Sequence, residues 1–147
     1  MDERDGPTDP MALLQTVNFV IPQLAVGGRY FWPQRLRRAG ITHLLCARRR
    51  PDTLEGFVCF HNPMADDGAS QTAAYWLRTV EFALGVLSNP RNKLYVHCAA
   101  GKNRGPAHAY AILLALGHAP AEARALIGRA RRKAATRYFD DVESAIL

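Results

Sequence analysis

Short apolar runs alternate with segments of helical periodicity along most of this chain, and this alternation limits the possible fold more than any other feature. Five runs are typical of buried strands: Val17–Ile21, Gln23–Val26, Ile41–Cys46, Phe57–His61 and Leu94–Val96. Five segments are typical of helices: Gln34–Ala39, Gln71–Leu87, Gly105–Leu116, Pro120–Ala134 and Tyr138–Ile146. The alternation predicts an α/β fold, a single domain with a central, mostly parallel, twisted sheet of four to five strands flanked by helices.

The length of the chain sets the number of domains. Its 147 residues fit one compact domain with one core. The first ten residues are acidic and polar, which predicts a disordered tail at 1–10 and a folded domain over 11–147. No segment approaches the roughly 20 apolar residues that cross a bilayer. We therefore expect a cytoplasmic protein without a membrane span.

The cysteines and histidines show no metal-binding pattern. Cys46, Cys59 and Cys98 are an odd and sparse set, with no Cys/His cluster at zinc spacing, so we expect reduced thiols. Free cysteines are among the most buried residues, and we expect Cys46 and Cys59 to be structural core residues. Three histidines are interpreted as structural or surface residues: His61, His108 and His118.

Cys98 differs from the other cysteines because it lies between a predicted strand and a predicted helix, where α/β sheets bind ligands. The turn of Ala99, Ala100 and Gly101 can aim successive backbone N–H groups at one anion, and the helix start adds its free amides. Arg104 offers two parallel donors to phosphate oxygens. These positive surroundings favour the thiolate of Cys98, which is a nucleophile for in-line attack on a bound phosphate.

This loop resembles a family signature. His97-Cys98, five residues and Arg104 between a strand and a helix are similar to the His-Cys-x5-Arg motif of the protein tyrosine phosphatase superfamily. With the opening Ile21–Gly28, the likeness to the small dual-specificity branch covers about residues 17–146. It implies the cysteine phosphatase fold, a phosphocysteine on Cys98, and no metal or cofactor. His97 would tune the nucleophile and fix the loop. Phosphate would be bound by Ala99, Ala100, Gly101, Lys102, Asn103 and Arg104.

In this family a loop some thirty residues before the cysteine supplies the general acid, which typically contributes about 10²–10⁴-fold to the rate. Met64–Ala69 lies at that distance and resembles the Asp-Asp-Gly-Ala stretch of the phosphatases of regenerating liver, where the second aspartate is the acid. The resemblance assigns Asp67 as the catalytic acid, with Asp66 as the alternative. Without the cysteine loop, Asp-Asp-Gly would indicate simple turn chemistry.

Three residues of the loop depart from the common pattern and leave alternatives open. Gly105 stands where the family usually has Ser or Thr, whose hydroxyl helps the phosphocysteine break down. This predicts slow turnover and admits a phosphate-binding pseudophosphatase. Lys102 also occurs in phosphoinositide phosphatases, and Asn103 in the RNA 5′-triphosphatase branch. The favoured function is a protein tyrosine or dual-specificity phosphatase acting on phosphorylated proteins; phosphoinositide, inositol phosphate and RNA 5′ phosphate are alternative substrates.

The formal net charge of +6 is concentrated in two runs, Arg48–Arg50 and a second one that comprises Arg129, Arg131, Arg132, Lys133 and Arg137. Positive charge favours anionic partners, whether phosphate esters, nucleic acid or acidic lipid, and a solvated surface is the alternative interpretation of either run. No recognised nucleic-acid-binding motif accompanies the charge, so we expect a phosphate monoester as the partner and not nucleic acid.

Overall fold

The computed structural model describes residues 17–28, 33–99 and 102–147. The predicted tail at 1–10 lies outside these residues, as do Ala100 and Gly101 of the cysteine loop. Five described strands form one sheet: β1 (Asn18–Ile21), β2 (Leu24–Gly27), β3 (His43–Cys46), β4 (Val58–His61) and β5 (Leu94–His97). Their order is β1-β2-β5-β3-β4, and every neighbouring pair is parallel except the β1–β2 hairpin. The predicted mostly parallel sheet is confirmed.

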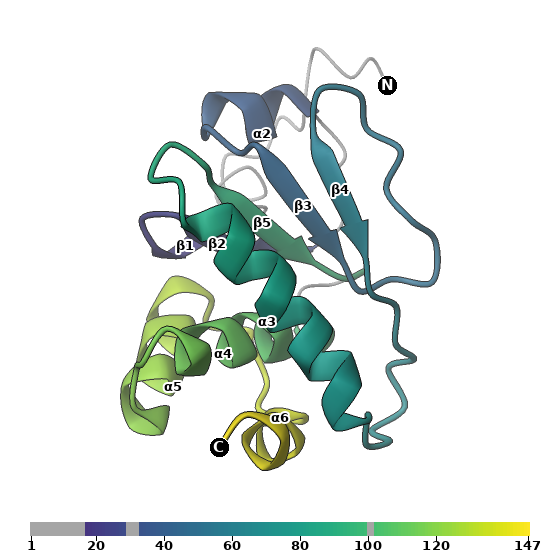
Figure 1. The fold of residues 1–147 in the computed structure, drawn as a ribbon, viewed down its shortest axis with the longest axis vertical. Coiled ribbons are helices and arrows are strands. Elements are labelled where there is room, and N and C mark those ends of the chain that lie inside the picture. Colours follow the sequence, from purple (N-terminus) through teal and green to yellow (C-terminus); the bar gives the residue numbers. More distant parts are fainter. Residues whose placement is uncertain (1–16, 29–32, 100–101) are drawn as a thin grey trace.

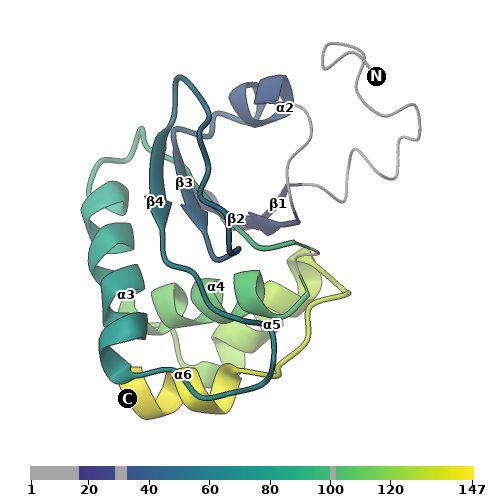
Figure 2. The same ribbon diagram turned by 90° about the vertical axis from the view of Figure 1, so that its right-hand side faces the viewer.

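Helices cover both faces of this sheet unequally. The described helices are α2 (Pro33–Arg38), α3 (Ala73–Leu87), α4 (Arg104–Ala115), α5 (Pro120–Ala130) and α6 (Phe139–Ile146). Figures 1 and 2 show α3, α4, α5 and α6 gathered on one side of the sheet, with α2 on the other. Within the described ranges, no helix has both the length and the apolar character needed to cross a bilayer.

Alternation of side chains along the strands builds the core on both faces. Leu24 and Val26 of β2 pack with the four-helix side, whereas Ala25 between them packs with Leu36 of α2. Successive strand residues point to opposite faces, so a strand buried on both sides is apolar throughout. β2 and β5 are completely buried, and their residues are apolar apart from Tyr95 and His97 of β5.

Helix α5 ends at Ala130, whereas the sequence pattern predicted an end at Ala134, and that prediction was wrong. Arg131 is extended (φ −142°, ψ 95°) and leaves the helix. The N–H of Ala135 donates to the Lys102 carbonyl at 2.7 Å, so the segment after α5 contacts the cysteine loop. The nearest glycine, Gly128, lies inside the helix, and no Gly or Pro follows Ala130 to mark its end in the sequence.

Cys59 is exposed, so the prediction that it is a core residue was wrong, whereas Cys46 is buried as predicted. Cys59 lies on β4, the edge strand of the sheet, where neighbouring Val58 is 55% exposed. An edge strand has fewer neighbours to cover it than a central one, and the sequence alone does not reveal the order of the strands.

The carboxyl ends of three parallel strands meet at one point of the sheet. His97, at the end of the central strand β5, pairs with Gly27 of β2 on one side and Cys46 of β3 on the other. Cys98 follows directly, and α4 starts at Arg104. The fold thus places the cysteine loop between a central strand and a helix N-terminus.

Candidate active site

Cys98 lies at the junction of β5 and α4. Its Sγ accepts a hydrogen bond from the Gly105 N–H at 3.3 Å, in the first turn of α4, and the residue is only 2% exposed. The amide and the positive end of the helix dipole both favour negative charge on the sulfur. The sequence prediction of a cysteine at a helix N-terminus is confirmed, and Ala99, Lys102, Asn103 and Arg104 are the described residues of its loop.

Arg104 joins the cysteine loop (residues 98–104) to the loop that contains Asp66 and Asp67, which we call the acidic loop (residues 64–69). Its Nη1 donates to the Met64 carbonyl at 3.1 Å and to the Ala47 carbonyl at 3.5 Å. Its Nε is buried and has no hydrogen-bond partner in the described part of the chain. Burying a guanidinium N–H without an acceptor is costly, so this donor is well suited to an incoming phosphate oxygen.

A cavity of about 360 Å³ lies beside Arg104. Its other lining residues come from the basic loop after β3 and from the start of the acidic loop: Arg49, Pro63, Met64 and Ala65. Two arginines therefore line a space whose other described lining residues are apolar. Such a space favours a phosphate ester with an apolar or aromatic alcohol.

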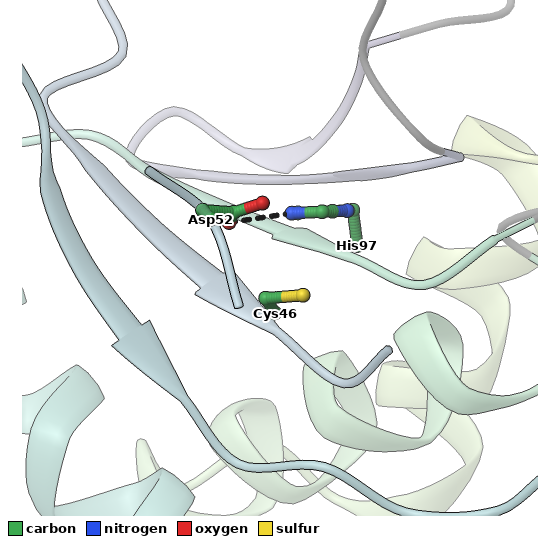
Figure 3. Close-up of side chains that lie close together, drawn as sticks. All are labelled: Cys46, Asp52 and His97. Atoms are coloured by element: carbon green, nitrogen blue, oxygen red, sulfur yellow. Dashed lines mark hydrogen bonds and ion pairs between the residues drawn. The ribbon is translucent and has the colours of Figure 1, made fainter. Parts of the chain in front are cut away.

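His97 is paired with an aspartate that the sequence analysis did not identify. Its Nε2 and Oδ2 of Asp52 are 2.8 Å apart, and both side chains are fully buried (Figure 3). Burial alone would lower the pKa of His97, but the hydrogen bond and charge of Asp52, together with Cys46, raise it to about 9. An imidazolium therefore precedes Cys98 at neutral pH. The sequence gives only a weak signal for Asp52, one of two carboxylates, with Glu55, in an otherwise basic loop.

The same residues are the one described group whose donor atoms could meet on a metal ion. Atoms of Cys46, Asp52 and His97 lie within 4.8 Å of one another (Figure 3). The imidazole and the carboxylate already form an ion pair, and the Cys46 thiol donates to the Arg50 carbonyl at 3.2 Å. These contacts use the Asp52 Oδ2, His97 Nε2 and Cys46 Sγ atoms, and Asp52 Oδ1 is buried with no hydrogen-bond partner in the described part of the chain.

Asp66 ties the acidic loop to the cysteine loop. Its Oδ2 accepts from Asn103 Nδ2 at 3.0 Å, and its Oδ1 accepts from the Tyr138 hydroxyl at 2.9 Å. Burial raises the pKa of Asp66, but these two bonds and the charges of Arg104 and Arg137 lower it further, so the net shift is downward. Asp66 is thus held as a carboxylate, which suits an anchor better than a proton donor.

Asp67 has different surroundings. Its side chain is exposed, and Oδ1 accepts from the Ala69 N–H at 2.9 Å in a local turn. The next residue, Gly68, has φ +79°, and a Cβ there would lie 2.8 Å from Arg137 Nη2. The turn therefore requires glycine. Among the described residues of the cysteine loop, Asn103 contacts Asp66, whereas the hydrogen bond of Asp67 stays within its own turn.

A buried polar network fixes the start of the acidic loop. Asn62 donates from Nδ2 to the Thr79 hydroxyl at 2.9 Å, and its carbonyl accepts from the Tyr75 hydroxyl at 2.6 Å. Both hydroxyls also contact His108 of α4, at Nδ1 (2.7 Å) and Nε2 (2.8 Å). Burial and the charge of Arg104 lower the pKa of His108 to about 3, so the imidazole is neutral. The network locks α3, α4 and the loop together.

Comparisons with known proteins identify the fold. No family model matches the chain. The structure of human DUSP28 is 21% identical over 95% of both chains, with a TM-score of 0.80. A mouse putative dual specificity phosphatase complexed with zinc tungstate is 20% identical over 96% of this chain and 90% of that chain (TM-score 0.78). The structure of PTPMT1 in complex with PI(5)P is 17% identical over 88% of this chain and 93% of that chain (TM-score 0.76). The chain therefore has the fold of the small dual-specificity phosphatases.

Proposed function

We propose that this protein is a cysteine-dependent phosphatase that hydrolyses phosphate monoesters through a phosphocysteine on Cys98. The observation that carries the proposal is the position of the Cys98 sulfur at the N-terminus of α4, where it accepts the Gly105 amide. Arg104, with a buried Nε that lacks a partner among the described residues, follows in the same loop. A nucleophile, a helix dipole and a free guanidinium donor are the parts that phosphoryl transfer needs.

The chemistry has two steps. In the first, the Cys98 thiolate attacks phosphorus, the P–O bond of the ester breaks, and Asp67 gives its proton to the leaving oxygen. In the second, water attacks the phosphocysteine, the P–S bond breaks, and Asp67 takes a proton from the water. Inorganic phosphate leaves and the thiolate is restored. Arg104 and the loop amides bind the phosphoryl oxygens in both steps.

Supporting residues act through these groups. Asp66 holds the acidic loop on the cysteine loop through Asn103, which keeps the neighbouring Asp67 near the leaving group. Asp52 keeps His97 protonated beside the nucleophile. Gly105 has no hydroxyl for the second step, so breakdown of the phosphocysteine limits turnover.

Phosphorylated proteins are the proposed substrates, as for a tyrosine or dual-specificity phosphatase, and the cytoplasm is the proposed location because thiols stay reduced there. A phosphoinositide or inositol phosphate is the second candidate, favoured by Lys102 in the loop and by the fold shared with PTPMT1, which is known in complex with PI(5)P. A pseudophosphatase would bind phosphate in the same loop with little turnover.

Hydrolysis of an aryl phosphate without added metal tests the proposal. We expect turnover by the purified protein, inhibition by vanadate, and no turnover above background in Cys98→Ser. Cys59→Ser is the matched control, because Cys59 is exposed on the far edge of the sheet. Unchanged activity in Cys98→Ser, or a strict need for a metal, would refute the proposal. Vanadate binding without turnover would assign a pseudophosphatase.

A further inference from the structure

A second cavity, of about 640 Å³, lies next to the cysteine loop. Seven described residues line it, of which five are cationic and none is acidic, and we call it the basic cavity; the cationic residues are Lys102, Arg129, Arg131, Arg132 and Lys133. A volume of this size matches sites for small molecules. Its charge selects an anion.

Carboxylates of the described residues leave most of the positive charge of the basic cavity unpaired. The ion pairs of the described residues join Asp52, Asp66, Glu122, Asp140 and Glu143 to other cations. Within that part of the chain, no carboxylate pairs with Lys102, Arg129, Arg132 or Lys133. The fifth cationic residue, Arg131, is hydrogen-bonded within the protein: its Nη1 donates to Asn18 Oδ1 of β1 at 2.8 Å. Four like charges around one space repel each other unless an anion enters.

The basic cavity borders the catalytic centre. Lys102 belongs to the cysteine loop, two residues before Arg104, and its carbonyl accepts from the Ala135 N–H at 2.7 Å. The segment that follows α5 and leads to α6 is thus fastened to the loop (Figure 2). Burial lowers the pKa of Arg131, while a negative charge on Cys98 would oppose that shift. Arg131 is therefore within electrostatic reach of the nucleophile.

We propose that the basic cavity binds a second phosphate group of the molecule whose first phosphate lies against Cys98. The inference rests on the proposed function and narrows its substrate to a small polyphosphorylated molecule. An inositol polyphosphate has this chemistry, either free in solution or as the headgroup of a lipid. Lys102 would lie between the two phosphates and interact with both.

The shape and chemistry of the lining favour this class over a larger polyanion. Arg129 and Arg132 offer planar forks that bind two phosphate oxygens, and Lys133 adds a point charge. The described lining residues include no aromatic side chain, so they offer the bases of a single-stranded nucleic acid no surface to stack on. A compact ring with several phosphates can place one in each site without an extended groove.

Charge-removal kinetics test the inference. Arg132→Gln/Lys133→Gln should raise KM for a soluble inositol polyphosphate about tenfold or more beyond any change in KM for an aryl monophosphate. The matched control Arg38→Gln/Arg91→Gln removes the same charge from exposed positions outside the cavity and should change neither KM beyond about twofold. Equal effects of the two double variants, or no effect on the polyphosphate, would overturn the inference.

Two further measurements separate the possible outcomes. Calorimetry of inositol hexakisphosphate binding to Cys98→Ser measures the second site without turnover, so it remains decisive even if aryl phosphate hydrolysis fails. Affinity should fall about tenfold in the Arg132→Gln/Lys133→Gln background. Turnover of vesicles that contain a phosphoinositide distinguishes a lipid headgroup from a free inositol phosphate, and either supports the inference. Dependence on Arg132 and Lys133 confined to a doubly phosphorylated peptide would overturn it.

Discussion

Replacing His108 with Gln should remove much of the acid sensitivity of folding. The imidazole is completely buried between α3 and α4. Because the Tyr75 hydroxyl gives its proton to the Asn62 carbonyl, it must accept from Nε2, which leaves Nδ1 to accept the Thr79 hydroxyl proton. A neutral imidazole satisfies every partner, and a proton on Nδ1 would place an uncompensated charge in the core, near Arg104.

The magnitude follows from the two pKa values of His108. Its pKa is about 3 in the folded protein and 6.5 in the unfolded chain, so the unfolded chain binds the proton first as the pH falls. The free energy of unfolding is therefore unaffected above pH 6.5 and declines below it. Linkage gives a loss of about 2 kcal/mol at pH 5 and about 3 kcal/mol at pH 4. For a chain of this size, 2 kcal/mol corresponds to a fall in Tm of roughly 4–8 °C.

Urea denaturation at pH 7, 6 and 5 measures this loss. His108→Gln lowers stability at pH 7, because the amide cannot match all of the imidazole contacts, but its further loss between pH 7 and pH 5 should be smaller than that of the wild type by about 2 kcal/mol. His118→Gln is the control, since His118 is partly exposed and paired with Glu122. Equal pH dependence in wild type and His108→Gln would refute the assignment of a neutral buried imidazole.

Three further predictions concern catalysis. Asp67→Asn should lower the aryl phosphate kcat by about 10²–10⁴-fold and leave vanadate affinity unchanged; a greater loss in Asp66→Asn would transfer the acid role to Asp66. Gly105→Ser should raise the steady-state rate, because a Cβ at this position lies 3.6 Å from the nucleophilic sulfur and would carry a hydroxyl beside the phosphocysteine. Gly105→Ala is the control, since its Cβ makes the same 3.3 Å contact with Val26 Cγ2 but carries no hydroxyl, and it should not raise the rate. Equal rates in both variants would contradict this. Asp52→Asn should slow alkylation of the nucleophile at pH 6 about tenfold, because the neighbouring imidazolium is lost; an unchanged rate would remove Asp52 from the mechanism.

The sequence predicted the fold well because the signals that specify it are local. Strand alternation, the long apolar stripe of α3 and the stop at Gly117 each depend on a few adjacent residues. The position of Cys98 followed from the strand and helix that flank it, with no knowledge of strand order. Where a boundary depends on a distant contact, as at Arg131, the pattern gave no warning.

The support around the nucleophile escaped prediction for the same reason. Asp52 meets His97 across 45 positions of sequence, and Asp66 meets Asn103 across 37. Neither pair shares a spacing that a helix or a turn would produce, so only the folded chain reveals them. The distinct surroundings of Asp66 and Asp67 likewise arise from Tyr138, a residue that sequence analysis assigned only to the last helix.

In the proposed mechanism the phosphoryl group is transferred to the sulfur of Cys98 before it reaches water. Acid quenching of the protein during turnover of an aryl phosphate, followed by mass spectrometry of its peptides, measures this directly. We predict a phosphoryl group on the peptide that contains Cys98, abundant in the steady state because Gly105 slows its hydrolysis, and absent from Cys98→Ser. Full turnover with no adduct, or an adduct on any other residue, would contradict the mechanism.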